Sequence, residues 1–214
     1  MQNTEVNMQN KKSGNLATNI IKALGLAILI TLALGYVLGY RAILVNGWSA
    51  QPQIPYHSLI VDCKTSLGNL KEGDYITFKN TSTYTTHRII AIKKDGYFAN
   101  GEIIVATIND KQYKMVVGEN DVYDINTPDS AISTSTSTQV TNCNIITMQS
   151  GTADVNKDYV NYNNVIGRVI YSNYLIGENI FSLRNNKYIL FGLLGLAVIT
   201  LIAKEQFDPE PQLY

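Results

Sequence analysis

The stretch Asp74-Tyr75-Ile76-Thr77-Phe78 indicates the fold class of this chain. It is short, rich in β-branched and aromatic residues, and preceded by the turn sequence Lys71-Glu72-Gly73, as is typical of a strand that follows a turn. Comparable stretches recur along the chain at residues 58–61, 88–92, 97–99, 103–105, 113–117 and 165–171. No helical period of useful length appears between residues 50 and 165. The sequence therefore predicts a mainly β protein with an all-β domain.

An apolar segment precedes this predicted domain. Residues 23–40 carry no charge over 18 positions, which is long enough to cross a bilayer, and we expect a transmembrane helix over residues 20–42. Lys11, Lys12 and Lys22 lie before it, so the positive-inside tendency places the N-terminus in the cytoplasm. A cleaved secretory signal is the alternative, but its apolar core is usually about 7–15 residues. An uncleaved anchor is therefore favoured.

A second apolar run follows the predicted domain. Residues 188–203 are uncharged and can span the bilayer if Lys187 and Lys204 extend to its polar surface. The flanking charges do not favour a cytoplasmic C-terminus, whereas the parity of two spans does. We thus expect a multi-pass protein of the cell membrane, with a disordered cytoplasmic tail (1–19), a transmembrane helix (20–42), an extracellular β domain (45–185), a second transmembrane helix (188–203) and a cytoplasmic tail (204–214).

Composition changes between residues 127 and 164. The run Ser133-Thr134-Ser135-Thr136-Ser137-Thr138 is of low complexity, and Asn, Asp and Tyr dominate the later part. Such a segment buries little apolar surface by itself, so we expect a long inserted loop with one strand near residues 144–148.

Overall composition narrows the range of functions. The chain has 214 residues, 16% of them charged, with 17 basic and 17 acidic residues, so its charge gives no reason to expect a nucleic-acid partner. Cys63 and Cys143 could pair outside the cell but do not make a disulfide framework, and we expect both to be dispensable for activity. No Cys/His cluster has zinc-ligand spacing and no glycine-rich phosphate loop follows a strand pattern. We expect no cofactor and no metal.

Ser49 and His87 are the residues that could carry chemistry. A serine hydroxyl is a poor nucleophile unless a base takes its proton, and a third group usually orients that base. The chain has two histidines. His57 lies in a turn-like stretch, whereas His87 opens a strong predicted strand, a rigid place from which to aim a side chain. Taken alone, each histidine is more readily explained as an ordinary solvated loop or strand-end residue than as a catalytic base.

Two short runs contain the candidate residues, Gly47-Trp48-Ser49-Ala50-Gln51-Pro52 after the predicted anchor and His87-Arg88-Ile89-Ile90. Together they resemble type I signal peptidases, in the archaeal and endoplasmic-reticulum branch that uses serine and histidine. The first run is similar to the family's Ser-Gly-Ser-Met-x-Pro box, which also follows an N-terminal anchor, and the second resembles its His-Arg-Val box. Further similar stretches, in the family's order, lie at residues 59–61, 71–78, 118–124, 166–169 and 175–177. Trp48, Ala50 and Glu119 differ from the family's residues.

The resemblance implies a membrane-bound serine endopeptidase that removes signal peptides after small residues. Ser49 would attack the scissile carbonyl, His87 would act as general base, and Asp124 would orient the imidazole, with Glu119 or Asp121 as alternatives for that last role. The backbone N–H of Ser49 is the natural oxyanion donor.

The implied partners are precursor proteins that carry signal peptides, with the lipid bilayer around the anchors. A paralogue devoted to a few dedicated client precursors is a variant of this interpretation. The alternative is a non-catalytic surface or assembly protein, a membrane-tethered β domain with a degenerate signal-peptidase fold. Bringing Ser49 and His87 together would distinguish the enzyme, because a structural protein has no need of that pair.

Overall fold

The structure, a computed structural model, describes residues 2–81, 83–109, 111–136, 138–149 and 156–186. The predicted second span (188–203) and the C-terminal tail (204–214) lie outside the described residues. The chain divides into two compact units, residues 1–41 and 42–214.

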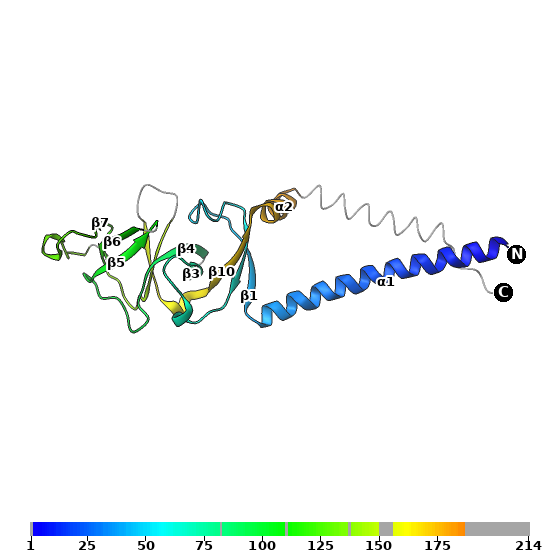
Figure 1. The fold of residues 1–214 in the computed structure, drawn as a ribbon, viewed down its shortest axis with the longest axis horizontal. Coiled ribbons are helices and arrows are strands. Elements are labelled where there is room, and N and C mark those ends of the chain that lie inside the picture. Colours follow the sequence, from blue (N-terminus) through cyan, green and yellow to red (C-terminus); the bar gives the residue numbers. More distant parts are fainter. Residues whose placement is uncertain (1, 82, 110, 137, 150–155, 187–214) are drawn as a thin grey trace. The chain divides into compact units, whose positions relative to one another are not determined.

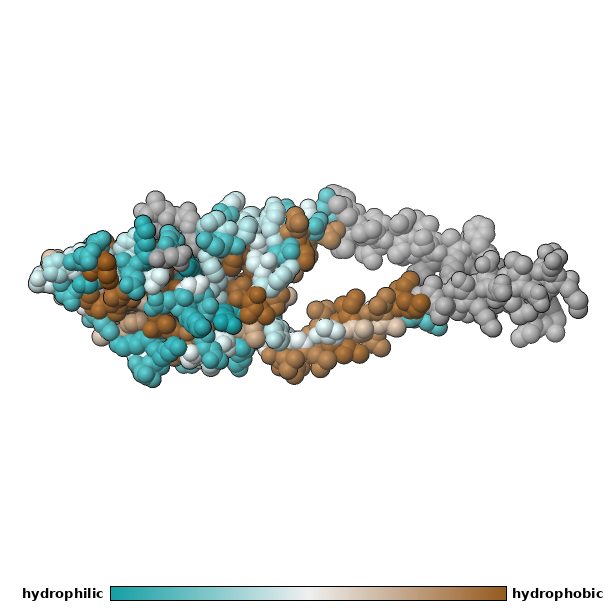
Figure 2. Space-filling model, viewed as in Figure 1, coloured by the Kyte–Doolittle hydropathy of each residue, from teal (hydrophilic) through white to brown (hydrophobic). Residues whose placement is uncertain are grey.

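The first unit is dominated by α1 (Gln2–Val37), which ends where Gly39 adopts a positive φ of 88°. The segment Asn19–Val37 has a mean hydropathy of 2.2, so α1 is long and apolar enough to cross a membrane. Figure 2 shows apolar side chains covering this part of the helix. The helix begins at Gln2, so its backbone also continues through the polar stretch that we expected to be a disordered tail.

The fold is mainly β, as the sequence predicted, and its larger sheet has seven strands among the described residues (Figure 1). Their spatial order is β1-β2-β10-β3-β4-β8-β9. The strands are β1 (Tyr40–Leu44), β2 (Leu59–Cys63), β3 (Tyr75–Asn80), β4 (Thr83–Ile92), β8 (Ile145–Met148), β9 (Lys157–Val160) and β10 (Val165–Asn173). In this spatial order, each pair of neighbours from β2 through β10, β3, β4 and β8 to β9 is antiparallel.

A smaller antiparallel sheet has the order β5-β6-β7. It contains β5 (Ile103–Ile108), β6 (Lys111–Val116) and β7 (Val122–Asp124). Short 3₁₀ turns at Leu67–Asn69, Asp129–Ala131 and Tyr162–Asn164 lie in the connections.

Three apolar clusters among the described residues hold the domain together. One, which includes Ile90, Met115 and Ile146, joins the larger sheet to the smaller one. A second, around Ile76, Phe78 and Ile89, gathers side chains of β3 and β4 with residues of β8 and β9. The third (Val45, Ala50, Ile54 and Ile60) packs the connection between β1 and β2 against the sheet. Residues that alternate along β4 thus contribute to clusters on opposite faces of the sheet.

The segment 127–164 is more ordered than its composition suggested. It contains β8, near the expected strand, and also β9, which we did not expect. All four residues of β8 are buried, because the strand lies between β4 and β9 and the sheet supplies apolar neighbours that the segment lacks by itself. The Ser/Thr-rich run is tied to Gly118, whose carbonyl oxygen accepts a hydrogen bond from the Thr138 amide at 3.1 Å.

A second helix, α2 (Tyr174–Asn185), follows β10 directly (Figure 1). The side chain of Asn173 caps its first turn by accepting a hydrogen bond from the Ile176 amide at 2.9 Å. We expected the whole of residues 45–185 to be β or loop, so this helix is a correction. Its signal is a short amphipathic run with an asparagine cap, and it is easily overlooked next to a strand pattern.

Candidate active site

Ser49 lies in the connection between β1 and β2. The base of this connection is closed by two backbone hydrogen bonds, from the Val45 amide to the Ser58 oxygen (2.9 Å) and from the His57 amide to the Val45 oxygen (3.0 Å). Ala50 is buried, so the chain is anchored directly after the serine. We call residues 45–58 the Ser49 loop.

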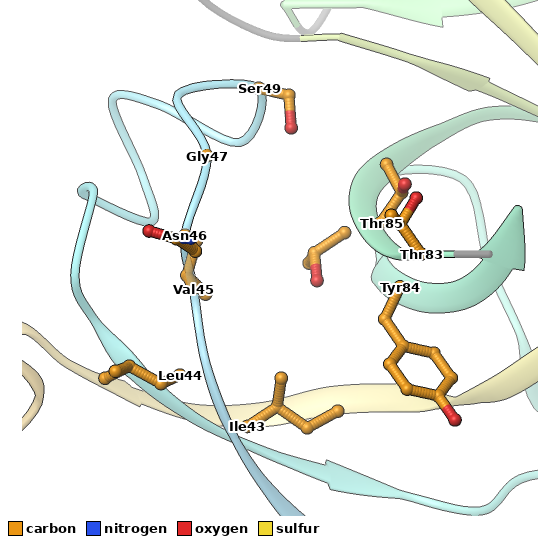
Figure 3. A pocket seen from close by; sticks show the side chains of 10 residues that line it. Ile43, Leu44, Val45, Asn46, Gly47, Ser49, Thr83, Tyr84 and Thr85 are labelled. Atoms are coloured by element: carbon orange, nitrogen blue, oxygen red, sulfur yellow. The ribbon is translucent and has the colours of Figure 1, made fainter.

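A pocket opens beside the Ser49 hydroxyl. One wall consists of residues 43–47 with Ser49, and the facing wall consists of residues 83–86 at the start of β4. Figure 3 shows the Ser49 side chain at the rim, with Thr83, Tyr84 and Thr85 across from it. The pocket thus lies between two stretches of chain, and hydroxyl groups stand on both sides of it.

His87 follows this facing wall directly in β4 and is buried. Its ring meets the ring of Phe78 edge-on, with 5.8 Å between centroids. Its Nδ1 lies 2.6 Å from Oδ2 of Asp158, in β9. The two atoms are within ion-pair distance, but their relative direction does not meet the geometry of a hydrogen bond. Nδ1 therefore has no hydrogen-bond partner among the described residues.

The contact with Asp158 favours one tautomer of His87. An ionised carboxylate offers only lone pairs, so the imidazole nitrogen that faces it carries the proton. That places the free lone pair on Nε2, the nitrogen that a general base uses. Nε2 is buried and has no hydrogen-bond partner among the described residues. The arrangement is that of a histidine oriented by an acid, with its basic nitrogen unused.

Strand register explains why Asp158 reaches His87. Asp158 pairs with Thr147 in β8, and Thr147 pairs with Ile89 in β4. Cross-strand partners point to the same face, and Ile89 shares its face with His87, two positions earlier. The carboxylate and the imidazole therefore meet on one face of the sheet, beside the second apolar cluster.

Lys157 and Tyr159, the neighbours of Asp158 in β9, point to the opposite face of the sheet. There they bind the stretch 118–124, one of the stretches similar to the signal-peptidase boxes. The Lys157 ammonium donates to the backbone oxygens of Glu119 (2.9 Å) and Asp121 (3.2 Å), and the Tyr159 hydroxyl accepts from the Gly118 amide (2.8 Å). Burial lowers the pKa of Lys157 to about 8, against the attraction of Asp121 and Glu119. Burial likewise raises the pKa of Tyr159.

Asp124, which we expected to orient the imidazole, lies elsewhere. It ends β7 in the smaller sheet, and its Oδ1 accepts a hydrogen bond from the Asn126 amide at 2.8 Å. Glu119 and Asp121 contact β9 through their backbone oxygens, on the face opposite to Asp158. The structure therefore brings the predicted box next to the strand that carries the acid, while the carboxylate on His87 belongs to Asp158.

The structure places Ser49 beside the two residues that precede His87, with no hydrogen bond between Ser49 and His87 themselves. Ser49 shares its pocket with Thr85 and Thr86, the two residues that precede His87. The Thr86 hydroxyl lies 2.9 Å from that of Thr77, which fixes this end of β4 to β3. Lys93 and Lys94, which directly follow β4, are both engaged in other contacts. Lys93 pairs with Glu102 (2.8 Å), and Lys94 donates to the Gly68 oxygen (2.8 Å).

Asp158 is the functional candidate that sequence reasoning missed. It stands in Asn156-Lys157-Asp158-Tyr159-Val160, within a segment whose polar composition indicated a loop. The short alternation that ends in Tyr159 and Val160 was the available signal for a strand. An acidic side chain that points inward from a strand is unusual, and it indicates that a partner for its charge lies nearby.

Within the described part of the chain, no three His, Cys, Asp or Glu residues come together as a metal site. Cys63 and Cys143 are free thiols, so they do not form the disulfide that their number allowed. No family model and no curated protein matches the chain. The functional conclusion therefore depends on the geometry of the site and on the sequence boxes.

Proposed function

We propose that this protein is a membrane-bound serine endopeptidase that cleaves signal peptides from exported precursors, similar to type I signal peptidases of the serine–histidine branch. One observation carries the proposal. A buried histidine holds its Nδ1 against a carboxylate and keeps its Nε2 unpartnered, one residue beyond the wall of a pocket that contains Ser49.

The residues have distinct roles in the proposed reaction. The Ser49 Oγ attacks the scissile carbonyl carbon while its proton passes to Nε2 of His87. The same nitrogen then returns the proton to the leaving amine as the peptide bond breaks. Water, deprotonated by His87, hydrolyses the acyl ester and regenerates Ser49. Asp158 takes the orienting role that the sequence suggested for Asp124, and its charge offsets the charge of the imidazolium.

The proposed reaction requires Oγ of Ser49 to reach Nε2 of His87, which does not line the pocket. Buried Ala50 and Ile54 anchor the Ser49 loop and limit how far its backbone can shift. Catalytic hydrogen bonds are often long in free enzymes and shorten when substrate binds. The pocket between residues 43–47 and 83–86 has room for an extended peptide that would press these walls together.

The membrane gives the proposal its substrate class. The segment Asn19–Val37 is long and apolar enough to span the bilayer, and Ser49 follows it closely in the chain. A signal peptide crosses the membrane as an apolar helix, so its cleavage site emerges near the level at which such an anchor ends. We propose a second span at residues 188–203, which places residues 45–185 outside and both termini in the cytoplasm.

The test is cleavage of a model precursor in membranes that contain the full chain or its Ser49→Ala variant. We expect the wild type to release the mature protein and the variant to lose this activity by several orders of magnitude. Ser66→Ala, which removes the hydroxyl before the first 3₁₀ turn, is the matched control and should cleave normally. Equal inactivity of wild type and Ser49→Ala on every precursor tried would contradict the proposal and favour a non-catalytic β domain.

A further inference from the structure

A second histidine–carboxylate pair joins the Ser49 loop to α2. Nδ1 of His57 donates a hydrogen bond to Oε2 of Glu178 at 2.8 Å. The His57 side chain is only 14% exposed, whereas that of Glu178 is 41% exposed. The pair links the last turn of the Ser49 loop to a helix far away in the sequence.

Four aromatic rings extend this link to the residue beside Ser49. Trp48 stacks on Tyr56 (4.6 Å between centroids, 11° between planes), and Tyr56 packs on His57 (3.7 Å, 35°). His57 in turn stacks on Phe181 of α2 (3.4 Å, 24°). The series runs from the position before Ser49 to the inner face of the helix, so a shift of α2 is transmitted through rigid rings rather than flexible chains.

The backbone of α2 also lies directly on the Ser49 loop. Gly177 is buried, and a Cβ at this position would collide with the backbone of His57, Ser58 and Leu59. Only glycine permits such an approach. His57 itself adopts a φ of +67°, a conformation that costs free energy in a non-glycine residue and persists where surrounding contacts hold it. Gly177, Glu178 and Phe181 together supply those contacts.

From this geometry we infer that α2 fixes the conformation of the Ser49 loop, and that Glu178 and Phe181 are positioning residues for the Ser49 nucleophile. The expected effect on cleavage rests on the proposed function. The expected effect on the conformation of the Ser49 loop rests on the geometry alone. Neither side chain lines the pocket beside Ser49, so both act through His57. Loss of the link should leave the substrate-binding walls in place and misplace the hydroxyl that attacks.

Trp48 is the chain's single tryptophan, and it reports on the loop independently of activity. In Glu178→Ala, the His57 ring loses its acceptor, so we expect Trp48 to lose part of its stacking and to become more accessible to acrylamide quenching. Phe181→Leu removes the ring that supports His57 and should have the same effect. Glu178→Gln keeps an acceptor oxygen for Nδ1–H and should restore the wild-type signal.

The same variants give the kinetic test, with the full chain in membranes and a model precursor. We expect Glu178→Ala and Phe181→Leu to lower kcat about tenfold while KM changes little, because a misplaced nucleophile slows the chemical step more than binding. Glu72→Ala removes a carboxylate that accepts from Thr107 on the smaller sheet, and it should change neither kcat nor Trp48 quenching.

Two outcomes would overturn the inference. One is wild-type kcat and wild-type quenching in both Glu178→Ala and Phe181→Leu. The other is a lowered kcat with unchanged Trp48 quenching, since the defect would then not pass through the loop. If Ser49→Ala itself cleaves normally, the proposed function fails. The quenching of Trp48 then decides the structural part of the inference, with a change supporting it and no change overturning it.

Discussion

His57 and His87, the two histidines of the chain, each present Nδ1 to a carboxylate oxygen, at 2.8 Å and 2.6 Å respectively. In each, Nε2 is buried and unpartnered among the described residues. Their surroundings differ. His57 lies in a left-handed turn with aromatic rings packed against it, whereas His87 lies in a strand that leads from the wall of the Ser49 pocket.

The difference shows that a histidine–carboxylate pair does not by itself define a catalytic base. Rings on either side of His57 occupy the space that a reacting group would need, so this pair serves to attach α2 to the Ser49 loop. His87 touches one ring edge-on and directly follows Thr85 and Thr86, which line the Ser49 pocket. We propose that access to Ser49, and not the charge partner, separates the two roles.

The largest expected effect separates the two histidines. His87→Ala should lower precursor cleavage by several orders of magnitude, because it removes the proposed general base for Ser49. His57→Ala should cost only about tenfold, since it loosens the loop without removing the base. Initial rates of precursor cleavage in membranes measure both. Near-normal cleavage by His87→Ala, beside an inactive Ser49→Ala, would assign the base to another residue.

The next effect separates two acids. Asp158→Asn should lower kcat by about 10²–10⁴-fold, because an amide can hold the imidazole but cannot offset its charge and can favour the wrong tautomer. Asp124→Asn, at the end of β7 in the smaller sheet, should change kcat by less than about threefold. Circular dichroism of both purified variants should match the wild type. A severe loss in Asp124→Asn with a mild one in Asp158→Asn would reverse the assignment.

A smaller effect concerns Lys157, beside Asp158. Its pKa is lowered to about 8 from 10.5, so between these values the unfolded chain binds more protons than the folded one, and this group makes the free energy of unfolding rise with pH. Comparing wild type with Lys157→Met cancels the other titrations. After allowance for its partial exposure, the difference between them should change by about 1 kcal/mol from pH 7.5 to 10.

Urea unfolding at the two pH values measures this change. The wild type should gain stability relative to Lys157→Met as pH rises, because its ammonium no longer has to stay charged while buried. A constant difference across the window would show that Lys157 titrates normally. Lys79→Met, an exposed lysine at the end of β3, serves as the control and should show no such change.

The smallest effect concerns the cysteines. Burial raises the pKa of Cys143 to about 11, whereas Cys63 is partly exposed. Alkylation at pH 8 should label Cys63 much faster than Cys143 in the folded protein, and both should react alike in denaturant. Cleavage should survive Cys63→Ser, since this residue lies in none of the matched boxes. Rapid labelling of Cys143 in the folded protein would contradict its burial.

The sequence predicted those parts of the molecule whose pattern is local. Strands such as β3 and β4 were predicted from their alternation and the turn residues around them, and the apolar segment from its length. The Ser49 and His87 boxes could be proposed because each is a short run with fixed spacing. The structure brings Ser49 beside Thr85 and Thr86, the residues that precede His87.

What the sequence could not supply depends on pairing between distant strands. Asp158 reaches His87 only because β8 inserts between β4 and β9, and the register of that insertion is not written in the local pattern. The same holds for Glu178, which meets His57 because Gly177 lets α2 approach the loop. Asp124 belonged to a box with the right order, yet pairing within the smaller sheet carries it away from the imidazole.

The most direct test of the catalytic assignment is a double-mutant cycle with His87→Ala and Asp158→Asn in the precursor-cleavage assay. If Asp158 acts through the His87 imidazole, the double variant should cleave no more slowly than His87→Ala alone, because without the ring the carboxylate has nothing to orient. Losses that multiply in the double variant would contradict this assignment, since the two residues would then contribute to cleavage independently.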